Sequence, residues 1–274
     1  MGIRINTNVA SINTRRHLYN ATIRYNKSME KLSSGLRINR AADDAAGLGI
    51  SEGLKSDIRA LQQASRNAAD GISLVQTAEG ALDEVSNILL RMKELAEQSL
   101  NGTLSDTERG YLDAEYTQLM AEIDRISDSA EFNGVKLLDS SGGSVAIQVG
   151  IGTQTYDSIA IDLSGDLDAA GLTIASGIDT SANATTAMGE IDAAIETVSS
   201  ARSDFGAIQN RLESSIRNIN NQTENLSAAN SRIRDVDVAN ETSTMTSYQI
   251  LQQAGVSMLA QANMSTGLAM ALMS

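Results

Sequence analysis

Few side chains in this sequence have the types and spacing that enzyme chemistry needs. The chain has a single histidine, His17, and no cysteine. A histidine-based triad, a thiolate nucleophile or a metal site with several His or Cys ligands therefore cannot be assembled from one chain. Because His17 follows Arg15 and Arg16 on an expected N-terminal helix, we interpret it as a polar interface residue.

Two further patterns fit a structural role better than a site. Asp43 and Asp44 could form a carboxylate pair, yet adjacent helical residues point about 100° apart, and acids at a helix start suit the helix dipole. Residues 47–53, GLGISEG, have the wrong glycine spacing for a dinucleotide-binding loop and follow no expected strand. The sequence thus predicts no catalytic, cofactor-binding or metal site, and no cofactor.

Charge is distributed unevenly along the chain. Residues 1–40 hold eight Arg or Lys against Glu30 alone, whereas residues 41–274 hold 13 basic and 33 acidic side chains. The basic cluster could suggest nucleic acid binding. The net charge of −13 and the lack of aromatic residues interleaved with these cations argue against it, so we expect no nucleic acid partner.

The C-terminal segment has an unusual composition. No charged side chain occurs from Thr242 to Ser274, although Gln, Asn, Ser and Thr are scattered through this segment. It is too polar to span a membrane and too free of charge for a solvated helix, and such a surface is typical of the core of a protein interface. The N-terminus has no apolar core or cleavage site, so we expect neither a cleaved signal peptide nor membrane insertion.

Hydrophobic spacing predicts long helices. Steps of three and four residues run from Ala45 to about Ser99 and again over 191–233, with shorter helices over 3–33, from the capping box at 105–108, and over 251–262. Apolar residues alternate over 145–149 and 159–163, which indicates a β-hairpin at about 145–163. The fold class is therefore mainly α, an elongated bundle of long coiled-coil-like helices with one small β-hairpin element.

Four stretches of sequence resemble signatures of bacterial flagellins. They are MGIRINTNVASINTRR, EKLSSGLRINRAADDAAGLGISE, AEFNGVKLL and SRIRDVDVANE, and the resemblance covers about residues 1–165 and 185–265. It implies inner filament-core helices at 1–40 plus 238–274 and a rod-like layer at 41–165 plus 185–237. Residues 166–184 are expected to form an exposed connecting loop in place of variable outer domains.

The resemblance also implies a function and partners. The chain would polymerise with many copies of itself into an extracellular filament for swimming motility, after export by the flagellar type III apparatus. A flagellar export chaperone, a cap protein and junction proteins would be its other partners, and the filament could be naked, sheathed or periplasmic. The alternatives are a hook-filament junction protein and a secreted receptor-binding effector.

Residues for self-assembly are expected at both ends of the chain, where apolar side chains would be ordered by contact with other copies. Arg37 and Arg40 are expected to meet acidic residues of neighbouring subunits. The apolar candidates are Ile5, Val9, Ile12, Leu251, Met258 and Leu259. The closing sequence ANMSTGLAMALMS departs from the family pattern, so the packing of residues past about 266 is not predicted.

The resemblance further implies a contact with the flagellin-sensing Toll-like receptor. In the family this contact lies around RVRELAVQ and a Glu on the next helix. The counterparts here are Arg91 and Leu95 within residues 91–98, RMKELAEQ, together with Glu115. The alternative interpretation is that Arg91 and Glu115 are solvated charges and that Leu95 belongs to the core of the rod.

Overall fold

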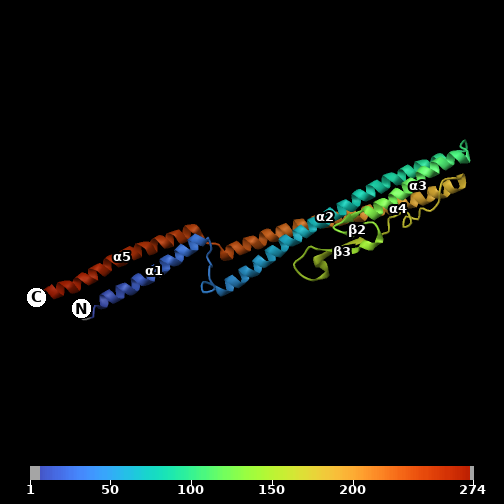
Figure 1. Ribbon diagram of the computed structural model, residues 1–274. Coiled ribbons are helices and arrows are strands. Elements are labelled where there is room, and N and C mark those ends of the chain that lie inside the picture. Colours follow the sequence, from blue (N-terminus) through green and yellow to red (C-terminus); the bar gives the residue numbers. More distant parts are fainter. Residues whose placement is uncertain (1–6, 272–274) are drawn as a thin grey trace. The chain divides into compact units, whose positions relative to one another are not determined.

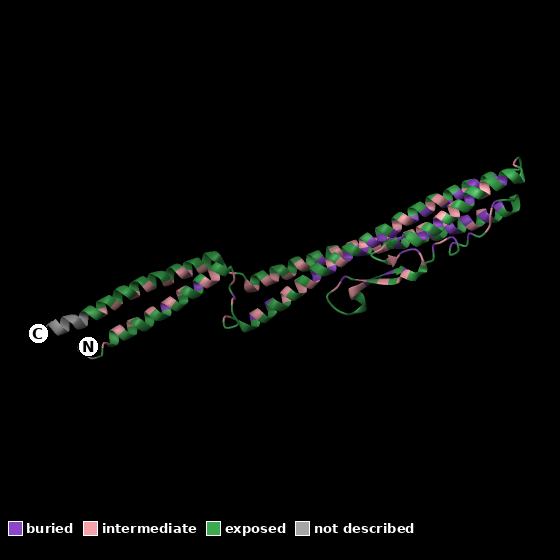
Figure 2. Cartoon of the chain, in the orientation of Figure 1, coloured by how far each residue is buried: buried purple, intermediate pink, exposed green. Residues whose placement is uncertain are grey.

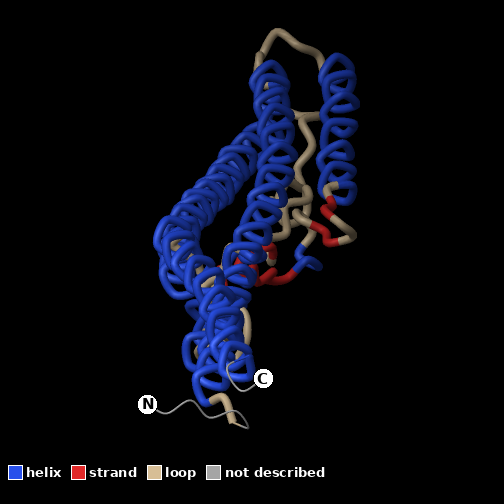
Figure 3. The backbone as a smooth tube through the Cα atoms, turned by 90° about the vertical axis from the view of Figure 1, so that its left-hand side faces the viewer, coloured by secondary structure: helices blue, strands red, loops and turns tan. Residues whose placement is uncertain are grey.

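The computed structural model describes the backbone of residues 7–271 and the side chains as far as Met264. Five long helices account for most of this part, which confirms the mainly α fold class (Figure 1). The helices are α1 (Val9–Ser34), α2 (Ala45–Ser99), α3 (Asp106–Ser129), α4 (Ser181–Arg234) and α5 (Val238–Ala271). The strands of this part all lie between α3 and α4 in the sequence, and Figure 3 shows them as short segments.

The chain divides into two compact units. The smaller unit comprises residues 1–56 and 225–274, and the larger unit comprises residues 57–224, so α2 and α4 each contribute to both. The predicted inner and outer layers divide the chain at other points, near residues 40 and 238. Those layers concern an assembled filament and stay a prediction.

In the smaller unit, α1 and α5 pack side by side and antiparallel. Asn8 caps α1 by accepting a hydrogen bond from the Ser11 N–H, and its side-chain amide donates to the Ala262 carbonyl at 2.8 Å. At the other end, α1 stops at Gly35, whose φ of +72° is the left-handed conformation that favours glycine. An antiparallel bridge between Leu36 and Asp235 follows directly, so both ends of the helix pair are fixed.

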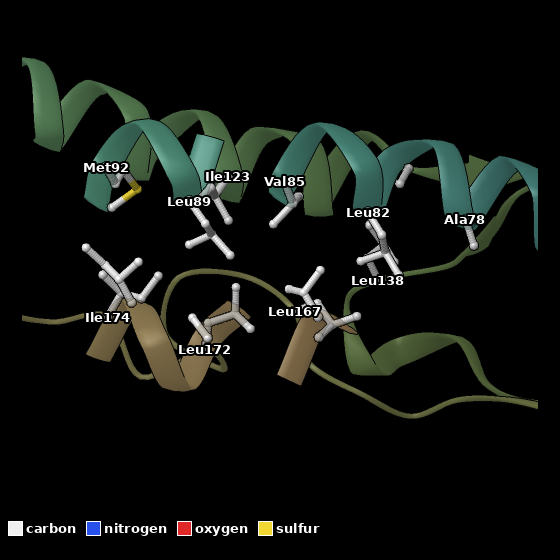
Figure 4. Close-up of a cluster of buried hydrophobic side chains, with 14 of the residues drawn as sticks. Ala78, Leu82, Val85, Leu89, Met92, Ile123, Leu138, Leu167, Leu172 and Ile174 are labelled. Carbon is white, nitrogen blue, oxygen red and sulfur yellow. The ribbon is translucent and has the colours of Figure 1, made fainter. Parts of the chain in front are cut away.

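The larger unit contains the hydrophobic core, which is formed by α2, α3, α4 and the segments between α3 and α4. Buried residues follow the predicted three-four stripe along α2 and α4, and the matching faces of α3 complete the cluster (Figure 2). Figure 4 shows the part of this cluster where α2 faces the connection before α4. The labelled members are Ala78, Leu82, Val85, Leu89, Met92, Ile123, Leu138, Leu167, Leu172 and Ile174.

Local signals in the sequence fix the start of α3 and the β-hairpins. The predicted capping box is confirmed, because Ser105 accepts from the Glu108 N–H while the Glu108 carboxylate accepts from the Ser105 N–H at 2.7 Å. The predicted hairpin is confirmed as the antiparallel pair β3 (Gly143–Gln148) and β4 (Ser158–Leu163). A smaller hairpin, β1 (Glu131–Phe132) with β2 (Val135–Lys136), turns at Asn133 and Gly134, which both have positive φ.

The sequence predicts an exposed loop over residues 166–184, and the structure shows a mixed arrangement in which most polar residues are exposed but the large apolar side chains are buried. This connection places its few large apolar side chains in the core, where each is at most 5% exposed. They are Leu167, Leu172, Ile174 and Ile178. Their spacing follows neither a helical nor a strand period, so the sequence pattern does not reveal that these side chains are buried.

Carboxylates on α3 and α4 hold this connection by accepting hydrogen bonds from its backbone. Asp113 accepts from the Ile178 N–H at 2.7 Å, and Asp124 accepts from the Ala169 N–H at 2.9 Å. Glu190 accepts from the backbone N–H groups of Ala175 at 3.0 Å and Ser176 at 2.9 Å, and also from the Ser176 hydroxyl. The connection is therefore ordered by charge-assisted bonds as well as by burial.

We expect Glu190→Gln to destabilise the chain and to flatten its pH dependence. Burial raises the pKa of Glu190, but hydrogen bonds from Ser176 and Ala175 outweigh this and hold the pKa below its ordinary value of 4.5. A lowered pKa contributes stability that is present above 4.5 and is lost as the pH falls through the folded-state value. The variant should lose about 1 kcal/mol at pH 7, since charge-assisted bonds are replaced by weaker ones.

Thermal and urea unfolding between pH 3 and pH 7 would measure this difference. Glu196→Gln is the matched control, because Glu196 is an exposed acid on the same helix. If both variants lost the same stability, or if the Glu190→Gln difference did not shrink in acid, the carboxylate would not hold the connection.

Candidate self-assembly surface

The helix pair of the smaller unit buries little of its own surface. Only Ala21 and Ser28 of α1 are buried, whereas Val9, Ile12 and Tyr19 are each 58% to 67% exposed. An ordinary helix of a globular protein covers its apolar stripe with the rest of its own chain. In α1 much of the apolar side-chain surface is left uncovered.

Helix α5 leaves even more apolar surface open. Five large apolar side chains in the charge-free part of α5, after Thr242, are each 55% to 64% exposed. At about 100° per residue they point in several directions around the helix rather than along one stripe. A helix that is apolar on several sides is normally buried on all of them. These residues are Ile250, Leu251, Val256, Met258 and Met264.

The side of α5 that faces α1 is specified by close and polar contacts. A Cβ built on Gly255 would lie 3.2 Å from Leu18 Cδ1, so glycine allows the two helices to approach closely. The Arg24 guanidinium lies over the Tyr248 ring, 5.9 Å from its centroid. Sequence reasoning did not single out these residues, since nothing in either helix alone reveals which residue of the other it meets.

The structure places the predicted apolar assembly residues as follows. Val9, Ile12, Leu251 and Met258 are exposed, as residues that meet other copies must be. Leu259 is half-buried beside a shallow cavity that Arg15, Arg16, Leu18 and Tyr19 also line. Ile5 lies outside the described residues. The exposed members are thus free to contact a partner along both helices.

The predicted cations Arg37 and Arg40 have partners within the chain. Arg37 donates from Nε to the Ile233 carbonyl at 3.2 Å, and Arg40 pairs with Glu30 at 2.8 Å. Both interactions are solvent-exposed, so each contributes little to the free energy of folding. Contacts of these two cations with acids of other copies stay a prediction.

Asp43 and Asp44 have separate structural roles, as the sequence suggested. Asp43 pairs with Lys27 at 2.7 Å and also accepts from the backbone N–H groups of Asn39 and Arg40. The hydrogen bond from Lys27 holds the pKa of Asp43 below its ordinary value. Asp44 accepts from the Gly47 N–H at 2.8 Å at the start of α2. Both carboxylates therefore order the turn between α1 and α2.

The predicted receptor-contact residues lie in the larger unit and are of two kinds. Arg91 and Glu115 are exposed and form an ion pair at 2.9 Å, and Arg91 also pairs with Glu94 at 2.9 Å. The Leu95 side chain is 1% exposed and belongs to the hydrophobic core, as the alternative interpretation held. Only the charged pair presents side chains to a partner.

The described residues also bear on metal binding and on membrane insertion. Within this part of the chain, no group of three or more His, Cys, Asp or Glu side chains is arranged to hold a metal ion. No helix of the same part is long and apolar enough to cross a membrane.

Comparison with known proteins identifies relatives along most of the chain. The family model for the bacterial flagellin N-terminal helical region matches residues 5–142, and that for the C-terminal helical region matches residues 188–268. A flagellin of Halalkalibacterium halodurans is 51% identical over 94% of this chain and 95% of its own. The flagellar filament 33 kDa core protein of Treponema phagedenis is 44% identical over 96% of both chains.

A solved structure is similar as well. The crystal structure of Bacillus cereus flagellin aligns with a TM-score of 0.51 and 34% sequence identity, over 60% of this chain and 94% of that one.

We expect Gly255→Leu to separate α5 from α1. The new side chain would collide with Leu18, and overpacking of this kind costs about 1–3 kcal/mol. Backbone amides of both helices should then exchange with deuterium faster than in the unchanged chain. Ala260→Leu is the control, because it adds the same side chain at an exposed position of α5. Equal exchange in the two variants would contradict the close approach at Gly255.

Proposed function

Because the chain belongs to the bacterial flagellin family and is a structural subunit of the flagellar filament, we propose that it polymerises by burying the exposed faces of α1 and α5 against copies of itself. The observation that carries this proposal is the surface of α5. It is free of charge from Thr242 onward and presents large apolar side chains on several sides, although α1 packs against it.

The energetics of an isolated helix pair support a need for several neighbours. Ordering a residue costs about 1–2 kcal/mol of conformational entropy, and burying apolar surface returns roughly 25 cal/mol per Å². With so few buried residues, the pair gains little from its own packing. Contacts with other copies in more than one direction around α5 would offset the remaining entropy cost of ordering the two helices. A contact between unlike surfaces of successive copies generates a helical filament.

We propose contacts of the larger unit as a second contribution to the filament. Its loop between β3 and β4 carries Ile151, 47% exposed, and Tyr156, 81% exposed. Large exposed apolar residues on an ordered loop are suited to a contact with a neighbouring copy. Arg37 and Arg40 would add contacts with acids of other copies, as the charge distribution suggests.

The remaining partners and the setting of the filament are proposals that rest on the family. They are an export chaperone on the C-terminal region, a cap protein, junction proteins, and a filament outside the cell that is naked, sheathed or periplasmic. A junction protein would share the terminal helices but would be made in few copies. A secreted receptor-binding effector would stay soluble when concentrated, and polymerisation separates that alternative from a filament subunit.

We expect Leu251→Asp to abolish polymerisation. An unpaired carboxylate on a face that becomes buried costs several kcal/mol, which should raise the critical concentration more than about 100-fold. Seeded growth followed by light scattering and electron microscopy would measure this effect. Leu251→Gln, which is polar but uncharged, should polymerise with a smaller defect, and circular dichroism should show equal helix content in both variants. Normal filaments from Leu251→Asp would refute burial of this face.

We also propose that the ion pair of Arg91 and Glu115 contacts the flagellin-sensing Toll-like receptor. Its support is the exposure of both side chains in one fixed arrangement on α2 and α3. Arg91→Ala should weaken binding of the monomer to the purified receptor ectodomain about tenfold or more, since truncating a hot-spot Arg of an interface costs about 2 kcal/mol or more.

Arg125→Ala is the matched control for this measurement. Arg125 is also exposed and pairs with Glu122 within α3. Equal affinities of the two variants in a surface-binding assay would contradict the receptor contact and favour solvated charges at both positions.

A further inference from the structure

We propose that Met29, Met258 and Met264 are three separate oxidation-sensitive modification sites that control assembly. Oxidation of their thioethers to sulfoxides by a hydroperoxide would block polymerisation of the free chain, whereas the assembled filament would shield them. The inference rests on the proposed function, because it takes these side chains to be buried between copies.

The exposure of the methionines supports this proposal. Met29 is 45% exposed, Met258 is 64% exposed and Met264 is 58% exposed, and all three lie on the helix pair of the smaller unit. Met92, in the core of the larger unit, is 0% exposed. Access to the sulfur governs how fast a methionine is oxidised, so one chain offers both susceptible and protected methionines.

Methionine also suits the surface on which these residues lie. Five of the ten methionines of the chain occur at or after Met245, in the segment that carries no charge. An unbranched thioether adapts to irregular apolar surfaces, which is useful where one helix meets several neighbours. The same thioether is readily oxidised while that surface faces water.

The chemical step is a two-electron oxygen transfer. A lone pair of the Met258 sulfur attacks the terminal oxygen of the hydroperoxide, the O–O bond breaks, and a sulfur–oxygen bond forms. With hydrogen peroxide the remaining oxygen leaves as water after proton transfer, so the sulfur is oxidised and the peroxide is reduced. The product is a polar, chiral sulfoxide in place of a flexible apolar group.

The sulfoxide changes the energetics of burial. Its oxygen is a strong hydrogen-bond acceptor in water, and it would have to give up water on a face that is covered by a neighbouring copy. We expect each buried sulfoxide to raise the critical concentration about tenfold. Each subunit would carry up to three such groups, so the penalty recurs at every subunit of the polymer.

The first experiment treats the free chain with dilute hydrogen peroxide, removes the peroxide and follows seeded polymerisation. Peptide mass spectrometry should find one added oxygen on Met29, Met258 and Met264 and none on Met92. Polymerisation should fall at least tenfold. Filaments that are treated after assembly should oxidise more slowly at the three sites and should remain intact.

A variant and a repair reaction test the assignment. The variant Met29→Leu, Met258→Leu and Met264→Leu should still polymerise after peroxide treatment, because leucine is similar in size and cannot be oxidised. Methionine sulfoxide reductases should restore polymerisation of the oxidised unchanged chain, which tests the site even if the variant assembles poorly.

Three results would overturn the inference. The oxidised chain could polymerise at the original critical concentration, the leucine variant could be inhibited as strongly as the unchanged chain, or the three methionines could oxidise no faster than Met92. Failure of the untreated chain to polymerise is a different result, and it would count against the proposed function.

Discussion

The structure depends on one imbalance, which is that α5 has more surface to bury than α1 can cover. Its inner side meets α1 through Gly255 and Tyr248, while Leu251, Val256 and Met258 stay open to water. A helix with this surface is stable in water only with further partners. Within the described part of the chain α1 is the helix that packs against α5, and the apolar side chains named above remain exposed beside it. Because the chain belongs to a filament-forming family, the partners expected to cover α5 are further copies of the same subunit.

In the larger unit, by contrast, the apolar stripes of the helices bury one another. Helices α2, α3 and α4 close a continuous core, and the connection before α4 adds Leu172 and Ile178 to it. Carboxylates such as Glu190 then satisfy backbone N–H groups of a segment that has no regular structure of its own. One part of the subunit is therefore completed by its own residues, and the other part has a surface that requires assembly. This contrast suits a protein that must exist both as a free chain and in a polymer.

Sequence reasoning succeeded where the determining interactions are local. The capping box at Ser105, the stripes of α2 and the alternation in β3 and β4 each depend on residues close together in the chain. It did not predict the burial within residues 166–184, whose order depends on Asp113 and Asp124, 65 and 45 residues from the backbone groups they hold, and on Glu190 of the next helix. The register of α1 against α5 was likewise not predictable, since Leu18 and Gly255 are separated by most of the chain. For Leu95 the sequence did not distinguish a receptor contact from a place in the core of the rod, and the burial of its side chain favours the core.

The uneven charge distribution can be explained by the exposed surface of α5 that α1 does not cover. The cations near the N-terminus have acidic partners close by, as in Lys27 with Asp43 and Lys31 with Glu241. All 33 acids of residues 41–274 precede Thr242. When many copies bring the same helix together, any charge on it would be repeated at short range in a medium of low dielectric, where like charges repel strongly. Because the one charged residue of α5 is Glu241 in its first turn, the rest of the helix avoids this repulsion. The scattered Gln, Asn, Ser and Thr side chains can still form hydrogen bonds that favour one packing over another.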